Sequence, residues 1–209
     1  MRLPDETYEY IKGEIADIFK RLNICQYPID GRRLADKMGI AVVAYSSLSH
    51  DEMESVGKIQ DGYCVGSINQ DFIVFDDACD PRRQEMTIRH EIGHLVLGHD
   101  GNERNIMIQE SEAKFFGKYL GAPPPLVHLA MLRHDCPLKE AFFLTNEAAR
   151  FAGKYYFSWI FNASRNGLSA NDVLILNQFG IKGRRLARYE RTIEEVKDHI
   201  IQKTKHSSN

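Results

Sequence analysis

One twelve-residue stretch constrains the fold of this chain more than any other, "RHEIGHLVLGHD" at residues 89–100. His90 and His94 are four positions apart in it, and Glu91 directly follows the first histidine. On an α-helix this spacing places both imidazoles on one face. The neighbouring residues are mostly apolar, so the sequence predicts a largely buried helix whose histidines need polar partners.

The surrounding sequence predicts where this helix begins and what precedes it. Asp80 before Pro81 is typical of a capped helix start, and Gly98 is a natural helix end. We therefore expect a helix over about 81–97. The segment 61–77 predicts two strands, 63–68 and 72–75, joined by a turn, and "IAVVAY" at 40–45 predicts a further strand.

Two histidines on one helix face suit two corners of a tetrahedral zinc site. Zinc lowers the pKa of a bound water from about 15.7 to about 7. Glu91, beside the open corner, is placed to accept the proton from that water. Gly93, between the histidines, would let another backbone or a ligand come close. The pattern indicates a hydrolytic zinc site with Glu91 as general base.

The spacing leaves several residues open as the third metal ligand. His99 and Asp100 follow the motif closely, but Gly98 stands one position late for the metzincin pattern, in which a glycine turns the chain back. A glutamate on a following helix is the other common source. The helix that we expect over 109–121 offers Glu110 and Glu112.

Elsewhere the sequence predicts mostly helix, with one clear boundary. Apolar spacing predicts a helix over 6–22, and the segments after residue 138 read as helices. The run "GAPPP" at 121–125 is the strongest candidate for a boundary. We expect an α+β fold in which a small antiparallel sheet packs on a zincin-like helical core. Residues 1–122 would form a metallopeptidase domain and 123–209 a helical C-terminal region.

Composition narrows the class of protein. The formal net charge is −2, which indicates neither a nucleic-acid-binding protein nor a membrane protein. The chain has no apolar run of 18 residues, and its start does not resemble a secretory signal. The four cysteines are widely spaced, and we expect them to be reduced in a cytoplasmic protein. The basic segment 182–209 is typical of a solvated helix face, so direct nucleic-acid binding is not expected.

Several features in order resemble the ImmA/IrrE family of metallopeptidases. The resemblance covers roughly residues 25–152, about three-fifths of the chain, and the ordered combination is more specific than the zinc motif alone. Its parts are, in chain order, "IDGRRLADKMGIAVV", a hairpin ending in "FIVFDD", the run "RRQEMTIRHEIGHLVLGH", the helix "ESEAKFFGKYLGAPP" and "LKEAFFLTNEAARF".

The resemblance implies a role for each matching residue. It makes His90 and His94 zinc ligands, Glu91 the general base and Glu110 the third ligand. The chain departs from the family after Ala113, where an asparagine is usual and Lys114 stands here. Lys114 is four residues after Glu110 and could pair with its carboxylate, which keeps Glu112 open as the ligand. Gly117 stands where the family commonly has a second alanine.

The family implies a function as well. Members of the family are usually cytosolic regulators in bacteria, phages or integrated mobile elements. Those that are proteases cleave a partner repressor with a helix-turn-helix DNA-binding domain, which relieves repression. We therefore expect a zinc-dependent, site-specific endopeptidase. The alternative is a zinc-bearing regulatory protein that senses or displaces a DNA-bound partner without cutting it. The sequence does not assign the oligomeric state or the residue that stabilises an oxyanion, for which Tyr119, His128 and His134 are candidates.

Overall fold

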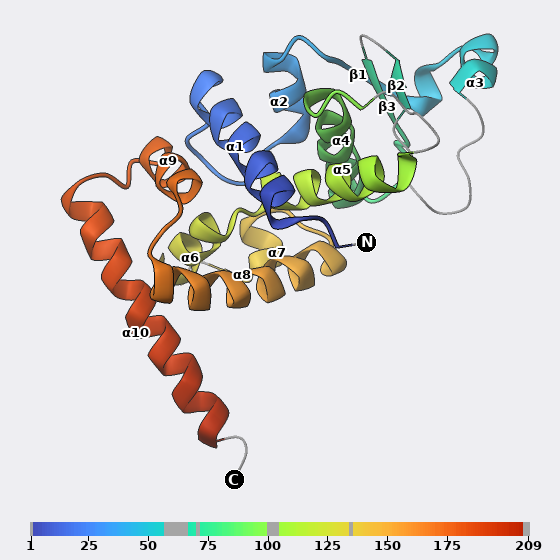
Figure 1. Ribbon diagram of the computed structural model, residues 1–209. Coiled ribbons are helices and arrows are strands. Elements are labelled where there is room, and N and C mark those ends of the chain that lie inside the picture. Colours follow the sequence, from blue (N-terminus) through green and yellow to red (C-terminus); the bar gives the residue numbers. More distant parts are fainter. Residues whose placement is uncertain (1, 57–66, 70–71, 100–104, 134–135, 207–209) are drawn as a thin grey trace.

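The computed structural model of the protein describes residues 2–56, 67–69, 72–99, 105–133 and 136–206. Most of these residues are helical, and a small sheet lies at one end of the molecule beside α3 (Figure 1). The α+β expectation is confirmed in this broad form. The helices are α1 (Asp5–Arg21), α2 (Gly31–Lys37), α3 (His50–Val56), α4 (Pro81–Val96), α5 (Ile106–Gly121), α6 (Pro124–Arg133), α7 (Leu138–Ala141), α8 (Asn146–Asn166), α9 (Ala170–Gln178) and α10 (Arg184–His206).

The sheet corrects the expectation of a purely antiparallel arrangement. Its strands β1 (Ala41–Ala44), β3 (Phe72–Phe75) and β2 (Ser67–Asn69) lie side by side in that order. β2 and β3 form the antiparallel pair that the sequence predicted, but β1 pairs with β3 in parallel. A parallel pair needs a long crossover connection, and here the chain between the two strands provides it and contains α3. The residues around β1 give no indication of its pairing with β3, because the two strands are far apart in the sequence.

The central helix α4 forms where the sequence predicted it. The Asp80 side chain accepts a hydrogen bond from the Arg82 backbone N–H at 2.9 Å, and Pro81 occupies the first turn. The helix ends before Gly98, whose positive φ of 66° suits a residue without a side chain. Ile88 and Ile92 are fully buried on α4, which confirms that the motif lies on a largely buried helix.

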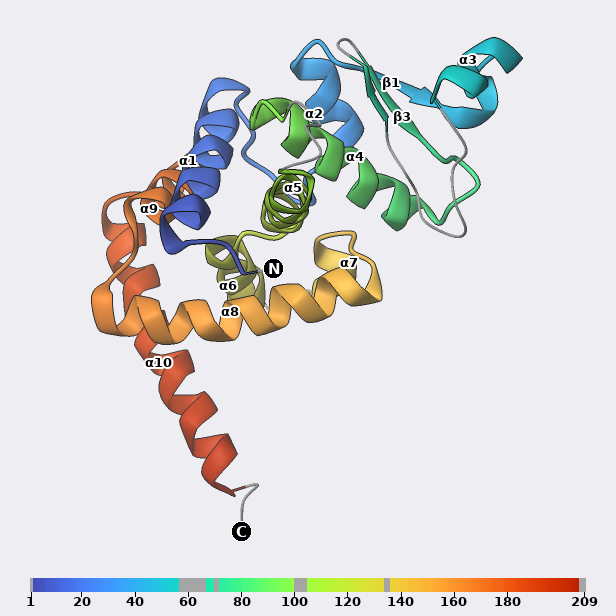
Figure 2. The same cartoon turned by 45° about the vertical axis from the view of Figure 1, so that its right-hand side comes forward.

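The proline run joins two helices of the same core. α5 ends at Gly121 and α6 begins at Pro124, where the missing proline N–H groups would have had no helical acceptor. Buried residues on both sides of this run belong to one hydrophobic cluster, which extends from Leu3 to Ile193. In both views α8 lies below α5 and α6, and the C-terminal part of α10 extends away from the other helices (Figure 1, Figure 2).

A buried ion pair fastens the segment before α2 to α4. Arg89 is 1% exposed, and its guanidinium donates two hydrogen bonds to the Ile29 carbonyl at 2.6 and 3.1 Å. Glu85 lies 3.5 Å from Arg89 and accepts the Gly31 backbone N–H at 2.6 Å. A second cation, Arg32, donates to the same carboxylate at 2.9 Å. This network fixes the helix that carries the histidines against the N-terminal part of the chain.

His128 connects α6 to α8 and α10 through a chain of hydrogen bonds. Its Nε2 lies 2.9 Å from the Thr192 hydroxyl, which itself donates to the Tyr189 carbonyl. Nε2 must therefore carry the proton and donate it to Thr192. Nδ1, 2.8 Å from the Tyr156 hydroxyl, then accepts from that group. Every partner is satisfied when His128 is neutral, and burial lowers its pKa to about 4.

Acid is expected to destabilise the protein through His128. The folded state holds the imidazole neutral, so the unfolded chain binds the extra proton below its ordinary pKa of about 6.5. This contribution, about 3 kcal/mol, is fully present above pH 6.5 and is lost as the pH falls toward 4. Urea unfolding of wild type and His128→Gln from pH 7 to pH 4 measures it. The difference in the free energy of unfolding between the two proteins should shrink as the pH falls. A difference that stays constant with pH would contradict a neutral, buried His128.

Within the described residues, no helix is both long and apolar enough to cross a membrane. Cys25 and Cys136 are free, as expected, and both are exposed. Cys79 is disulfide-bonded, so the expectation of reduced cysteines is wrong for that residue.

Candidate metal centre

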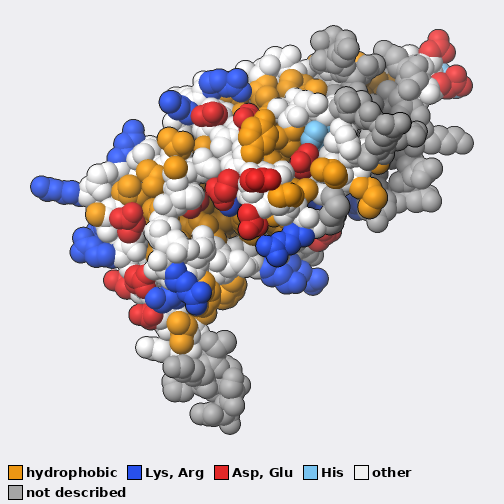
Figure 3. Space-filling view, in the orientation of Figure 1, with side chains coloured by type: hydrophobic (Ala, Val, Ile, Leu, Met, Phe, Trp, Pro, Cys, Tyr) orange, Lys and Arg blue, Asp and Glu red, His pale blue; other side chains and the backbone are white. Residues whose placement is uncertain are grey.

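Three side chains converge where α4 and α5 lie side by side. The Nε2 atoms of His90 and His94 are 3.1 Å apart. The Glu110 carboxylate of α5 lies 3.3 Å from His90 Nε2 and 3.4 Å from His94 Nε2 through its two oxygens. On the face in Figure 3, a histidine side chain reaches the surface beside acidic side chains. The structure thus brings together the three residues that the resemblance assigned as ligands.

The separations between these atoms fit a small tetrahedral cation. Bonds of about 2.0–2.1 Å to zinc require neighbouring ligand atoms to lie about 3.3 Å apart. The three distances of 3.1, 3.3 and 3.4 Å are close to that value. Two imidazole nitrogens and one carboxylate also match the ligand types of catalytic zinc sites, in which a fourth position stays open. The group can hold a metal ion.

The close contact between α4 and α5 brings Glu110 to the histidines. A Cβ added to Gly117 would lie 3.0 Å from the His90 backbone nitrogen, so a larger residue here would push the two helices a few tenths of an ångström apart. Gly93 makes a similar contact, since a Cβ there would meet the Phe116 ring at 3.0 Å. The sequence predicted a close approach at Gly93, and the neighbour is a side chain rather than a backbone or a ligand.

His99 and Glu112, two of the alternative ligands, support His94 instead. His94 Nδ1 lies 2.9 Å from His99 Nδ1, and His99 Nε2 lies 3.0 Å from the Glu112 carboxylate. If His94 Nε2 faces a metal, its proton lies on Nδ1 and is donated to His99. His99 must then carry its own proton on Nε2 and donate it to Glu112. Sequence spacing gave no sign of this arrangement, which orients the His94 ring.

The charges at the centre suit a ligand set for a cation. Hydrogen bonds to His90 and His94 hold the pKa of Glu110 well below its ordinary value, so its carboxylate is ionised at neutral pH. Burial lowers the pKa of His99, which favours the neutral ring that the hydrogen bonds require. Lys114 forms no ion pair with Glu110, so the competition that the sequence left open does not occur.

The other candidate site residues from the sequence do not belong to the group of three converging side chains. Glu91 is buried on α4 next to His90, with an exposed fraction of 6%. Tyr119 and His128 are also buried and, like Glu91, are not among the residues that line the open cleft beside the metal centre. Asp100 and His134 lie outside the described residues.

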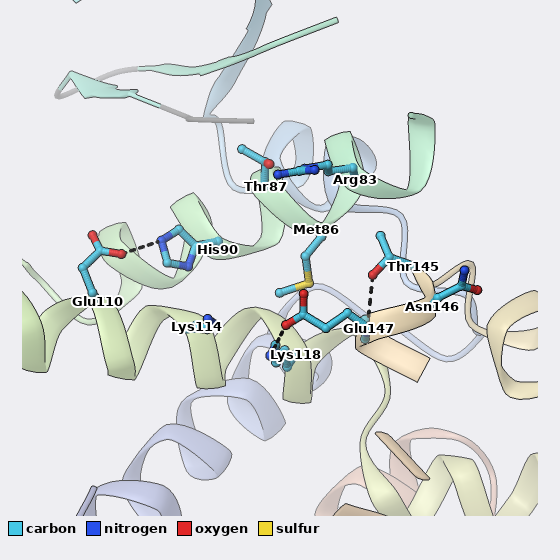
Figure 4. A pocket seen from close by; sticks show the side chains of 11 residues that line it. Arg83, Met86, Thr87, His90, Glu110, Lys114, Lys118, Thr145, Asn146 and Glu147 are labelled. Carbon is cyan, nitrogen blue, oxygen red and sulfur yellow. Dashed lines mark hydrogen bonds and ion pairs between the residues drawn. The ribbon is translucent and has the colours of Figure 1, made fainter. Parts of the chain in front are cut away.

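An open cleft of about 750 Å³ begins at the metal centre. His90 and Glu110 line one end, and the start of α8 lines the other (Figure 4). Arg83, Met86 and Thr87 of α4 form one wall. The cleft is large enough for several residues of an extended peptide.

Comparison with known proteins gives no match. No family model, curated protein or solved structure is significantly similar to this chain. The assignment of a function therefore depends on the chemistry of the site and on the resemblance described above.

Proposed function

We propose that this protein is a zinc-dependent, site-specific endopeptidase. The observation that carries the proposal is the convergence of His90, His94 and Glu110, because two of them, His90 and Glu110, line one end of an open cleft. Glu91 directly follows His90 in the sequence. A closed structural zinc site would use four protein ligands and would need neither a cleft nor an adjacent base. The arrangement supports a hydrolase of extended substrates.

Each residue has a part in the proposed reaction. His90, His94 and Glu110 would hold the metal, and His99 with Glu112 would keep the His94 ring in the required tautomer. When bound, zinc would supply Lewis-acid activation of water and of the scissile carbonyl. Glu91 would take a proton from the attacking water and pass it to the leaving amine. The cleft would hold the peptide in an extended form beside these groups.

The substrate is proposed to be a helix-turn-helix repressor, whose cleavage would relieve transcriptional repression in the cytoplasm. The resemblance to the ImmA/IrrE family supports this part of the proposal. The open cleft is consistent with it, since an extended segment of a protein can enter a cleft that is open along its length.

Glu91→Gln tests the proposal because it removes the base and keeps the shape of the side chain. Loss of a positioned general base is expected to slow cleavage by about 10²- to 10⁴-fold, with zinc content unchanged. The measurement is mass spectrometry of a repressor encoded by a neighbouring gene, after co-expression with wild type or the variant, together with a repression reporter.

The same experiment separates catalysis from binding. If the reporter responds equally to wild type and Glu91→Gln, and the repressor stays intact in both, the protein acts by binding its partner. If the repressor is cut at the same rate by the variant, Glu91 is not the base. Arg150→Gln, a change at an exposed position of α8, is the matched control and should leave cleavage unchanged.

A further inference from the structure

The cleft leads from the metal centre along one face of α5. Glu110, Lys114 and Lys118 are spaced by four residues and all line it (Figure 4). With a rise of 1.5 Å per residue, Lys114 lies about 6 Å and Lys118 about 12 Å along the helix from the metal ligand. Beyond the metal centre, Lys114 and then Lys118 therefore line the cleft.

Lys118 and Lys114 differ in whether a nearby carboxylate neutralises their charge. Lys118 pairs with Glu147 at 3.3 Å, and its ammonium lies 4.8 Å from the centre of the Phe151 ring. Lys114 is exposed and forms no ion pair or hydrogen bond with any residue that the structure describes. Glu110 is held by the two histidines and is not available to Lys114.

Two other features make this part of the cleft attractive to an anion. Arg83 of α4 also lines this part of the cleft, where it already interacts with another residue. The N-terminus of α8, a helix of 21 residues, ends the cleft with the positive end of its dipole. Glu147 is the only carboxylate of the lining beyond Glu110, and it is already paired with Lys118. The lining beyond the metal centre therefore carries an excess of positive charge.

We propose that Lys114 is a specificity-determining residue, which selects peptides with an acidic side chain about two residues from the bond that is cut. An extended peptide advances about 3.4 Å per residue, so the 6 Å between Glu110 and Lys114 corresponds to about two residues. The lysine would pair with an Asp or Glu side chain of the substrate. This inference rests on the proposed function and names the substrate class of the same site.

Selection from a random peptide library tests the inference without requiring cleavage. Zinc-loaded Glu91→Gln serves as the bait, and a phage-displayed library of dodecapeptides as the probe. Retained peptides are expected to be enriched in Asp or Glu. Adding Lys114→Glu to the bait should reverse the preference toward Lys or Arg, with binding of a selected acidic peptide weakened roughly fivefold or more. Lys154→Glu, an exposed change on α8 outside the cleft lining, should leave the preference unchanged.

The outcomes separate this inference from the proposed function. Retained peptides without acidic enrichment, enrichment that Lys114→Glu does not alter, or no retained peptide at all would each overturn the role of Lys114. Incubating selected peptides with zinc-loaded wild type then tests hydrolysis by itself. Acidic peptides that depend on Lys114 for binding but are not cut would leave the specificity assignment standing and would refute the peptidase.

Discussion

Glu110→Ala is expected to lose zinc binding altogether. Removing one of three protein ligands leaves two histidines, which cannot hold the ion in the geometry that the three observed separations define. Elemental analysis of protein purified without chelators should give about one zinc per wild-type chain and none in the variant. Zinc retained at full stoichiometry in Glu110→Ala would show that another residue completes the site.

Glu112→Ala is the matched control, two residues away on the same helix. Its carboxylate contacts His99 rather than the converging nitrogens, so the stoichiometry should stay near one zinc per chain. The affinity should fall by about 10- to 100-fold, because the hydrogen-bond chain that orients His94 would be broken. Competition with a chromogenic chelator measures this. If Glu112→Ala loses zinc completely and Glu110→Ala does not, the two roles are reversed.

Glu85→Ala is expected to destabilise the fold by about 3–5 kcal/mol. The substitution leaves the Arg89 guanidinium, which is 1% exposed, without its anionic partner, and it removes the acceptor of the Gly31 backbone N–H. Both groups would remain buried and incompletely satisfied. The free energy of unfolding, measured by urea denaturation of zinc-free protein, gives the size of the effect.

Glu140→Ala provides the comparison for this second prediction. Glu140 pairs with Arg82, but its side chain is 51% exposed, so loss of that pair should cost less than about 1 kcal/mol. Equal losses in Glu85→Ala and Glu140→Ala would show that the Arg89 network contributes little beyond an exposed ion pair.

The parts of the fold that were predictable from sequence are those with local causes. Asp80 and Pro81 begin α4 as expected, and Ser169 forms a capping box with Asp172 at the start of α9. The spacing of His90 and His94 alone determines that they share a helix face. These features depend on residues within one or two turns of each other, which sequence patterns report well.

The parts that were not predictable depend on contacts between distant segments. Nothing near residue 41 indicates that β1 pairs in parallel with β3. The role of His99 depends on the position of α5, because its Nε2 partner is Glu112 on that helix. Spacing offered both Glu110 and Glu112 as candidate ligands. Only the packing of α5 against α4 places the Glu110 carboxylate at His90 and His94, and the Glu112 carboxylate at His99.

The separation of the three candidate metal ligands depends on the absence of a Cβ atom at position 117. At Gly117 the two helices meet with no side chain between α5 and the His90 backbone. A chain with alanine at this point would hold its helices a few tenths of an ångström further apart, and its third ligand would have to reach correspondingly further. With alanine at position 117, this chain would therefore need a compensating change in the tilt of α5, or in the side-chain conformation of Glu110, to keep the three candidate ligand atoms at their present separations.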